Sequence, residues 1–380
     1  MGFCLVTIAL RPKSLISKIS NGLTALIICT LCQYAIADPT LRLSGRVDVD
    51  IASYDSDDTP LESGSNLRRL RLGAGGKLNS KLSYYLLADF KNGKYRAQAS
   101  WLRYSLDKEN QVFVGRIEIP FSLQRVSNSQ YSLFMERALP AAMNRHYGTG
   151  LVFLHKGERW SFRGGLFGKD YLNIGGSQTF GNAVAARLGR RFRTDDSRWW
   201  LGASAMYQDA LDIERVRFRP ESSVTSQRLV DTGRLRDLDK VMRVGIEGIW
   251  KKNSWSVQAE WINYTARGAA DNNLNFDGGY IEASRMFNGR RRFNFRSGEW
   301  AVPKVNSFKT WELAFRISHL DLQDRTISGG RETNYTLGVN YYFSPIARVM
   351  LNAIKVDASP NRHGVNESPS IIQARLQIGF

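Results

Sequence analysis

The chain has 380 residues, 43% of them hydrophobic, and a formal net charge of +18. Its three cysteines all lie within the first 32 residues, so the rest of the chain can form no disulfide and no thiolate metal site. A basic charge of this size is typical of proteins that bind nucleic acids and of proteins that handle anions, and the segments below decide between the two.

Residues 1–37 have the three parts of a secretory signal peptide. A basic region without acidic residues precedes an apolar run at 23–32 and the small-x-small site Ala35-Ile36-Ala37. The apolar run is too short to cross roughly 30 Å of hydrocarbon as a helix. We therefore expect cleavage near Ala37, a single mature domain at 38–380 and an exported protein with no nucleic-acid partner. Loss of three basic residues leaves a formal charge of +15.

Beyond residue 38 there is no run of 18 apolar residues, and hydrophobic residues recur with period two rather than with the spacing of a helix. In the first segment the expected lipid-facing row is Leu41, Leu43, Val47, Val49 and Ile51, and the expected water-facing row is Arg42, Ser44, Arg46, Asp48 and Asp50. The same alternation recurs at 69–77, 243–250, 255–261, 334–343 and 372–380. Alternating segments of about ten residues are typical of membrane β-strands.

The pattern predicts an all-β fold, a transmembrane antiparallel β-barrel of about 16 strands, with 14 or 18 as alternatives. Tryptophan and tyrosine recur at segment ends, and the chain ends on Phe380 in an apolar row, which favours a barrel over a soluble β-sandwich. The short turns expected are 194–197 and 288–289. The long polar connections expected are 52–66, 122–148, 208–214, 220–240 and 357–369.

If one face of each strand meets lipid, the other lines the lumen, and its arginines become candidate anion contacts. Arg215, Arg217 and Arg219 alternate with apolar residues, so an extended backbone would set them on one side about 6.8 Å apart. By the same parity Arg69 and Arg71 point inward, and Arg68 points outward.

Guanidinium groups bind oxyanions through two parallel hydrogen bonds and stay charged when partly desolvated. The candidate anion-binding or pore-lining residues are Arg42, Arg46, Arg69, Arg71, Arg125, Arg137, Arg215, Arg217, Arg219 and Arg243. The alternative is that inward-facing acids neutralise them, namely Asp48, Asp50, Asp89, Glu118, Glu247 and Glu260. The connection 122–148 is long enough to fold into the lumen and narrow it.

Several blocks of the sequence are similar to the phosphate-selective porins O and P of Gram-negative outer membranes. They are Arg68-Arg69-Leu70-Arg71-Leu72-Gly73, Val114-Gly115-Arg116, Pro120-Phe121-Ser122-Leu123, Phe134-Met135-Glu136-Arg137-Ala138-Leu139-Pro140, Arg219-Pro220-Glu221-Ser222, Tyr280-Ile281-Glu282-Ala283-Ser284, Trp311-Glu312-Leu313-Ala314, Leu320-Asp321-Leu322 and Asn334-Tyr335-Thr336-Leu337-Gly338-Val339-Asn340.

The resemblance implies a 16-stranded barrel, a homotrimer and a narrow lumen that conducts phosphate or polyphosphate. It assigns an arginine ladder to Arg215, Arg217 and Arg219, and constriction-loop cations to Arg125 and Arg137. The constriction lysines of the family have no counterpart, because residues 122–148 contain no lysine.

The sequence thus predicts an outer-membrane channel for inorganic phosphate or other small anions, surrounded by outer-membrane lipid and lipopolysaccharide, with no enzymatic activity, cofactor or metal. One alternative is a non-specific porin or structural barrel whose basic residues bind lipopolysaccharide, which external placement of residues 290–292 would favour. The other alternative is a lipid hydrolase. The scattered positions of the four histidines and the absence of a Gly-x-Ser-x-Gly motif argue against it.

Overall fold

The computed structural model describes residues 39–93, 95–169, 181–209, 217–235, 238–268, 273–325 and 327–380. The expected signal peptide at 1–37 lies outside these ranges. None of the helices within them is both long and apolar enough to cross a membrane.

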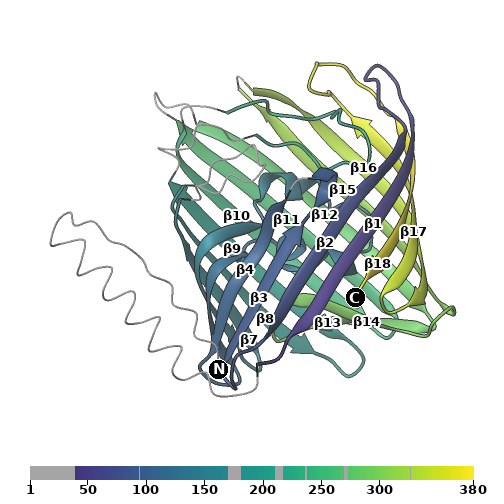
Figure 1. The fold of residues 1–380 in the computed structure, drawn as a ribbon. Coiled ribbons are helices and arrows are strands. Elements are labelled where there is room, and N and C mark those ends of the chain that lie inside the picture. Colours follow the sequence, from purple (N-terminus) through teal and green to yellow (C-terminus); the bar gives the residue numbers. More distant parts are fainter. Residues whose placement is uncertain are drawn as a thin grey trace, which may run out of the picture.

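Within the described ranges sixteen antiparallel strands close into one barrel, as predicted (Figure 1). Each strand pairs with its sequence neighbour in the ring, and β1 pairs with β18 to close it. The strands of the barrel are β1 (Arg42–Asp55), β2 (Gly64–Lys77), β3 (Leu82–Asp89), β4 (Arg96–Ser105), β5 (Asn110–Glu118), β6 (Tyr147–Lys156), β7 (Trp160–Phe167), β8 (Ala183–Arg193), β9 (Arg198–Asp209), β10 (Leu238–Lys252), β11 (Trp255–Gly268), β12 (Asn273–Phe287), β15 (Thr310–Asp324), β16 (Ile327–Ser344), β17 (Ala347–Ala358) and β18 (Ser370–Gly379).

The period-two rows face the sides that the sequence predicts. On β18, Ile372, Leu376 and Ile378 are exposed on the outer surface, whereas Gln373 and Arg375 are buried inside. The same division holds on β1, β10, β11 and β16. In the closed ring every strand pairs with a neighbour on both of its edges. The sheet therefore presents no open edge to hydrocarbon, where each unsatisfied amide costs several kcal/mol.

Exposed aromatic side chains gather near the short turns, where a barrel meets the lipid headgroups. They include Trp160, Phe192, Trp199, Trp255 and Trp311. The carboxyl end of the chain lies at the same end of the barrel, because Phe380 exchanges two backbone hydrogen bonds with Gly45 of β1.

The structure contains one of the two predicted short turns, and the prediction of the other is wrong. Thr194 to Ser197 forms a tight turn between β8 and β9. Asn288-Gly289 does not join barrel strands, because β12 and β15 are connected by a separate hairpin made of β13 (Gly289–Asn294) and β14 (Glu299–Val305). The hairpin begins at the short-turn end, so the arginines at 290–292 are not in an external loop.

The expected connections at 208–214 and 220–240 are parts of a single connection between β9 and β10. Its described part, residues 217–235, contributes no strand to the barrel. Arg217 and Arg219 therefore lie on this connection and not on a strand of the barrel, and Arg215 lies outside the described residues.

The expectation that Arg68 points outward is also wrong, and a β-bulge is the reason. Asp48 of β1 pairs with Arg69, but the next residue, Val49, pairs with Leu67, so Arg68 is an extra residue in β2. An extra residue interrupts the alternation of side chains. Arg68 and Arg69 are consequently both directed into the lumen, where each forms an ion pair.

Replacement of Leu351 tests which face meets lipid. Leu351 lies near the middle of β17 and is exposed on the outer surface. We expect Leu351→Arg to destabilise the folded barrel by about 2–4 kcal/mol, the cost of a basic residue at the bilayer midplane, and Leu351→Ile to change little. Urea unfolding in lipid bilayers measures both, and equal stabilities would mean that this face does not contact lipid.

Candidate functional site

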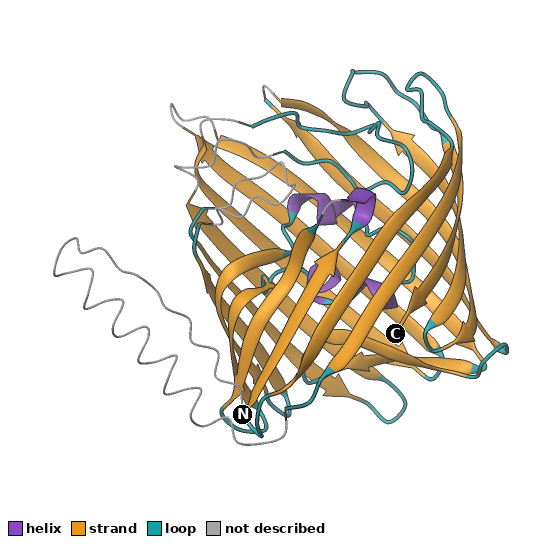
Figure 2. Cartoon of the chain, viewed as in Figure 1, coloured by secondary structure: helices purple, strands orange, loops and turns teal. Residues whose placement is uncertain are grey.

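The connection between β5 and β6, residues 119–146, folds into the barrel as the sequence suggested. It contains three short helical segments, α2 (Leu123–Val126), η2 (Ser129–Tyr131) and η3 (Leu139–Met143), which lie inside the ring of strands (Figure 2). Its backbone is bonded to the inner wall: the Leu123 amide donates to Glu260 of β11 at 3.0 Å, and the Met135 amide donates to Asn352 of β17 at 3.0 Å. We call this segment the inward loop.

Apolar side chains hold the inward loop against one side of the wall. Phe121, Leu139 and Met143 join a buried cluster of side chains from β5–β12 and β15. Phe134 packs against Ala314 and lies under the guanidinium of Arg316, 4.4 Å from its ring centre. Gly338 makes room for the Phe134 ring, since a Cβ at residue 338 would stand 2.9 Å from it. Each such side chain contributes about 1.5–3 kcal/mol by its burial.

A second inward segment is formed by residues 217–235, above the inward loop. Phe218 is fully buried against Tyr264 and Phe276, with ring centres 4.6 Å and 6.1 Å away. Further along, Ser223 donates to Gln373 of β18 at 2.9 Å and its carbonyl accepts from Asn66 of β2 at 2.7 Å. The segment therefore crosses the lumen from the β10–β12 side to the wall formed by β18, β1 and β2.

The β13–β14 hairpin packs on the inward loop from the short-turn end. The Trp300 amide donates to Ser127 at 3.3 Å, and Arg291 donates to the Tyr131 carbonyl at 2.8 Å. Trp300 and Phe293 pack with Leu123 in one buried cluster. The hairpin thus narrows the lumen on the short-turn side of the inward loop, and the 217–235 segment narrows it on the opposite side.

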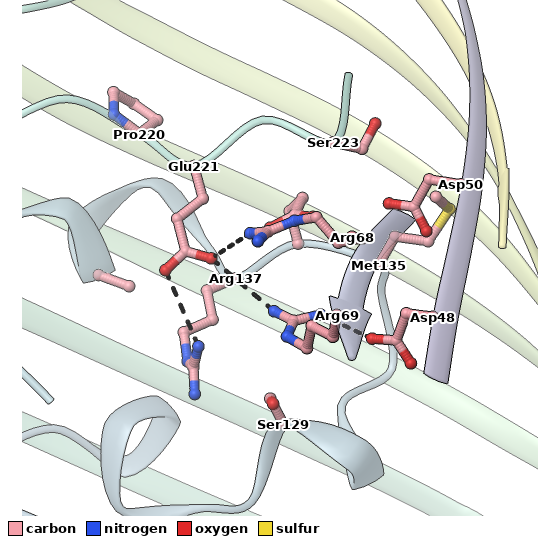
Figure 3. A network of polar contacts seen from close by, with 12 residues as sticks. Asp48, Asp50, Arg68, Arg69, Ser129, Met135, Arg137, Pro220, Glu221 and Ser223 are labelled. Carbon is pink, nitrogen blue, oxygen red and sulfur yellow. Dashed lines mark hydrogen bonds and ion pairs between the residues drawn. The ribbon is translucent and has the colours of Figure 1, made fainter. Parts of the chain in front are cut away.

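Where the inward loop and the 217–235 segment meet β1, β2 and β18, charged side chains form a buried network, which we call the arginine cluster (Figure 3). It consists of Arg46, Arg68, Arg69, Arg125, Arg137 and Arg375 together with Asp48, Asp50, Glu136 and Glu221. The six guanidiniums exceed the four carboxylates, so the cluster carries a formal charge of +2.

Three of the carboxylates are fixed by short contacts. Glu136 accepts two hydrogen bonds of 2.8 Å from Arg68, and Asp50 accepts from Arg375 at 2.6 Å and 2.7 Å. Asp48 lies 2.9 Å from Arg69. The two-bond geometry is the strong form of this interaction.

The structure brings four of the ten candidate arginines together in this cluster: Arg46, Arg69, Arg125 and Arg137. Arg71 lies beside them, paired with Asp89 at 2.9 Å. In these ion pairs inward-facing acids neutralise part of the charge of the arginines, which is the alternative that the sequence left open.

The remaining candidates lie elsewhere. Arg243 is buried beneath the loop, where it donates to the Met143 carbonyl at 3.0 Å and thereby holds the end of the inward loop. Arg42 is exposed at the start of β1. Arg217 is paired with Asp231, with Nε and Oδ1 2.7 Å apart, and Arg219 is exposed.

Sequence reasoning missed Arg68, Arg375, Glu136 and Glu221 as members of the cluster. Arg375 could have been found, because it lies in the polar row of the last segment. The bulge at Arg68 leaves no pattern in the sequence. Glu136 and Glu221 meet Arg68 across separations of 68 and 153 residues.

Two cavities of about 330 Å³ and about 300 Å³ lie on the short-turn side of the inward loop. Both are lined by Arg71, Tyr85, Asn128 and Tyr131, and Arg46 of the cluster lines the second. Open volume in this half of the barrel therefore adjoins the arginine cluster along the β1–β5 wall.

A closed barrel with an apolar outer face and loops folded into its lumen is the architecture of an outer-membrane porin. Residues 41–380 match the family of phosphate-selective porins O and P, and the chain belongs to this family. The resemblance seen in the sequence is confirmed, and the family is one of channels rather than enzymes.

One relative and two solved structures are similar to this chain over most of its length. A protein of Caulobacter vibrioides described as uncharacterized is 24% identical over an alignment of 375 positions, which covers 92% of this chain and 76% of that protein. An anion-selective porin from Comamonas acidovorans shares 13% identity with a TM-score of 0.60, covering 90% of this chain and all of that one. In-vitro folded OmpT of Vibrio cholerae shares 11% with a TM-score of 0.58, over 91% of this chain and all of OmpT. At such identities these structures support the fold.

Removal of the Phe134 ring tests what holds the inward loop. We expect Phe134→Ala to remove about 3–5 kcal/mol from the packing of the loop and to leave the barrel folded, because Phe134 is not part of the strand pairing. Single-channel recordings should then show a larger and noisier conductance. Tyr335→Ala, on the outer face of β16, serves as the control. An unchanged conductance in Phe134→Ala would exclude the inward loop as the constriction.

His146, at the end of the inward loop, reports on the positive potential of the cluster. Burial, and next to it the charges of Arg137 and Arg125, hold the pKa of His146 well below its usual value. The ring is therefore expected to be neutral at the pH where an ordinary histidine is half protonated. Because Arg137 lowers the pKa, Arg137→Gln should raise it. Histidine NMR signals, assigned with His146→Gln, measure both values, and a normal pKa in the unmodified protein would contradict the positive potential.

Proposed function

We propose that this porin is an anion-selective channel through which small oxyanions, such as phosphate or polyphosphate, diffuse across the outer membrane. The observation that carries the proposal is the arginine cluster, which has a surplus of positive charge at the level where three segments narrow the lumen. Rings of arginine or lysine select anions in pores by charge, and several weak sites let an ion move on.

The cluster also has hydrogen-bond donors to spare. Nε of Arg69, Nε of Arg125 and Nη2 of Arg137 are buried and have no hydrogen-bond partner among the described residues. A buried N–H group without a partner costs free energy. An oxyanion that passes the cluster would supply the missing acceptors, which supports oxyanions rather than cations as the permeant species.

Further arginines extend from the cluster toward each end of the barrel. Arg71 lines the cavities on the short-turn side, and Arg219 is exposed on the opposite side. The likeness of the fold to that of the anion-selective porin from Comamonas acidovorans agrees with the proposal. The inward loop lacks lysine, so preference for phosphate over other small anions would rest on arginine alone.

The dense pairing of guanidinium and carboxylate groups favours one competing function, a general porin with little charge preference. If Asp48, Asp50, Glu136 and Glu221 cancel the field of the arginines, the lumen would pass ions of either sign. The surplus of two positive charges and the unpartnered nitrogens favour anion selectivity.

We further propose that the exported chain loses residues 1–37, resides in the Gram-negative outer membrane in contact with lipid and lipopolysaccharide, and assembles as a homotrimer. The family assignment supports the location. One of the solved OmpT structures is described as a trimer form, which supports the assembly.

Reversal potentials in a salt gradient test the proposed function. With potassium chloride we expect a potential of the sign given by anion preference, and phosphate should reduce the chloride current by competing for the cluster. Arg137→Gln should lower the anion-to-cation permeability ratio severalfold, because it removes a charge from a poorly hydrated constriction.

Arg285→Gln is the matched control for that variant. Arg285 lies on the outer face of β12, stacked over Trp255 with its guanidinium carbon 5.3 Å from the ring centre, so its loss should leave selectivity unchanged. Cation preference in the unmodified protein would end the proposal of an anion channel.

A further inference from the structure

Glu221 differs from the other carboxylates of the arginine cluster in its position. It stands on the 217–235 segment, not on a strand, and its carboxylate lies among four guanidiniums, of which Figure 3 labels Arg68, Arg69 and Arg137. Oε2 is 2.8 Å from Arg68 and 4.0 Å from Arg69, and Oε1 is 3.2 Å from Arg125 and 3.9 Å from Arg137. Each oxygen therefore faces two arginines, and the four come from β2 and the inward loop.

The neighbours of Glu221 keep its carboxylate at this position. Arg228 donates to the Pro220 carbonyl at 2.6 Å, the Ser222 hydroxyl lies 3.2 Å from that of Tyr54 on β1, and Ser223 is bonded to β18. These contacts fix the backbone on both sides of residue 221. The side chain itself is bonded only through the guanidiniums among the described residues.

Glu221 is also the carboxylate of the cluster that solvent reaches most easily. Its side chain is 30% exposed, against 0% for Asp48 and Asp50 and 8% for Glu136. Burial alone would raise the pKa of Glu221, but Arg125, Arg68, Arg137 and Arg69 outweigh that effect and hold the pKa well below its usual value. The group is therefore an anion at neutral pH, and it is the one that an incoming anion could replace.

The hydrogen-bond donors around Glu221 outnumber the acceptor positions of a single carboxylate. Two carboxylate oxygens face four guanidiniums, and the unpartnered nitrogens of Arg69, Arg125 and Arg137 belong to these same groups. All three side chains are buried, with 5–10% of their surface exposed. A tetrahedral oxyanion has four acceptor oxygens, so it matches this set of donors better than the planar carboxylate does.

We propose that Glu221 is a tethered competitor, a carboxylate of the chain itself that occupies an oxyanion site formed by Arg68, Arg69, Arg125 and Arg137, and that permeating phosphate binds there by displacing it. The inference rests on the proposed anion channel and names the regulation of that site. A competitor attached to the wall weakens net binding of the permeant anion, and weak binding lets it leave quickly. Four arginines without the carboxylate would instead hold phosphate long enough to slow its passage.

The test is the concentration of inorganic phosphate that halves the chloride current through the channel in planar bilayers. We expect Glu221→Gln, which keeps the size of the side chain but removes its charge, to lower that concentration about tenfold, the effect of one charge-assisted contact. Glu221→Asp keeps the charge but draws the carboxylate back from the arginines, so it should lower the concentration by a smaller factor and protects the test if the glutamine variant does not fold.

Glu62→Gln is the control, because Glu62 is exposed on the β1–β2 connection beside the 217–235 segment, where its amide donates to Thr225 at 3.3 Å. It removes the same charge near the same mouth and should leave the phosphate block unchanged. If Glu62→Gln strengthens the phosphate block as much as Glu221→Gln does, the loss of any nearby negative charge explains the effect, and the inference is overturned.

The outcomes separate this inference from the proposed function. Block by phosphate in the unmodified protein with equal or weaker block in both Glu221 variants would show that the carboxylate only stabilises the segment; the anion channel would stand and the inference would fall. Cation preference in the unmodified protein would remove the proposed function. Block that emerges only in Glu221→Gln would support the competitor and refute phosphate as the natural permeant.

Discussion

The hydrogen bonds between β1 and β18 join the two ends of the sheet, and the inside and outside of this protein exist only because of that closure. An open sheet of the same strands would expose two rows of unpaired amides to hydrocarbon. Closure also brings together residues from the two ends of the chain: Asp50 and Arg375 are opposite each other in the register of β1 and β18, and their side chains form a two-bond ion pair. The arginine cluster is built around this seam.

The interior is filled unequally. On the side of β6–β12 and β15, inward-facing apolar residues such as Tyr264, Phe276 and Leu320 are covered by the inward loop and the 217–235 segment. On β1, β2 and β18 the inward-facing residues are mostly polar or charged, whereas β3–β5 also turn apolar side chains such as Trp101, Phe113 and Ile117 toward the first of the two cavities, which lie on this side. The hydrophobic effect attaches the connections to the first of these sides, and the two cavities adjoin the other side, next to the arginine cluster.

Charge balance in the cluster reflects two opposing requirements. Six guanidiniums in a partly desolvated space need counter-charges, since an unpaired buried charge is costly. Complete neutralisation, however, would remove the attraction for a permeant anion. The bulge in β2 is the local device that resolves part of this conflict, because it sets Arg68 and Arg69 side by side inside the barrel and gives each a different carboxylate, Glu136 and Asp48.

The sequence by itself determined the barrel, its approximate strand number, and the face on which residues such as Arg46, Arg69, Arg375 and Leu376 lie, because alternation of side chains is a local property of an extended backbone. It also indicated that residues 122–148 could enter the lumen. Only the tertiary structure decided that Arg68 turns inward, that residues 289–305 form a hairpin inside the short-turn end, and that Glu136 and Glu221 meet arginines far away in the chain. A bulge depends on how two strands pair, and the course of a connection depends on the wall it contacts; neither is encoded in the period of the sequence.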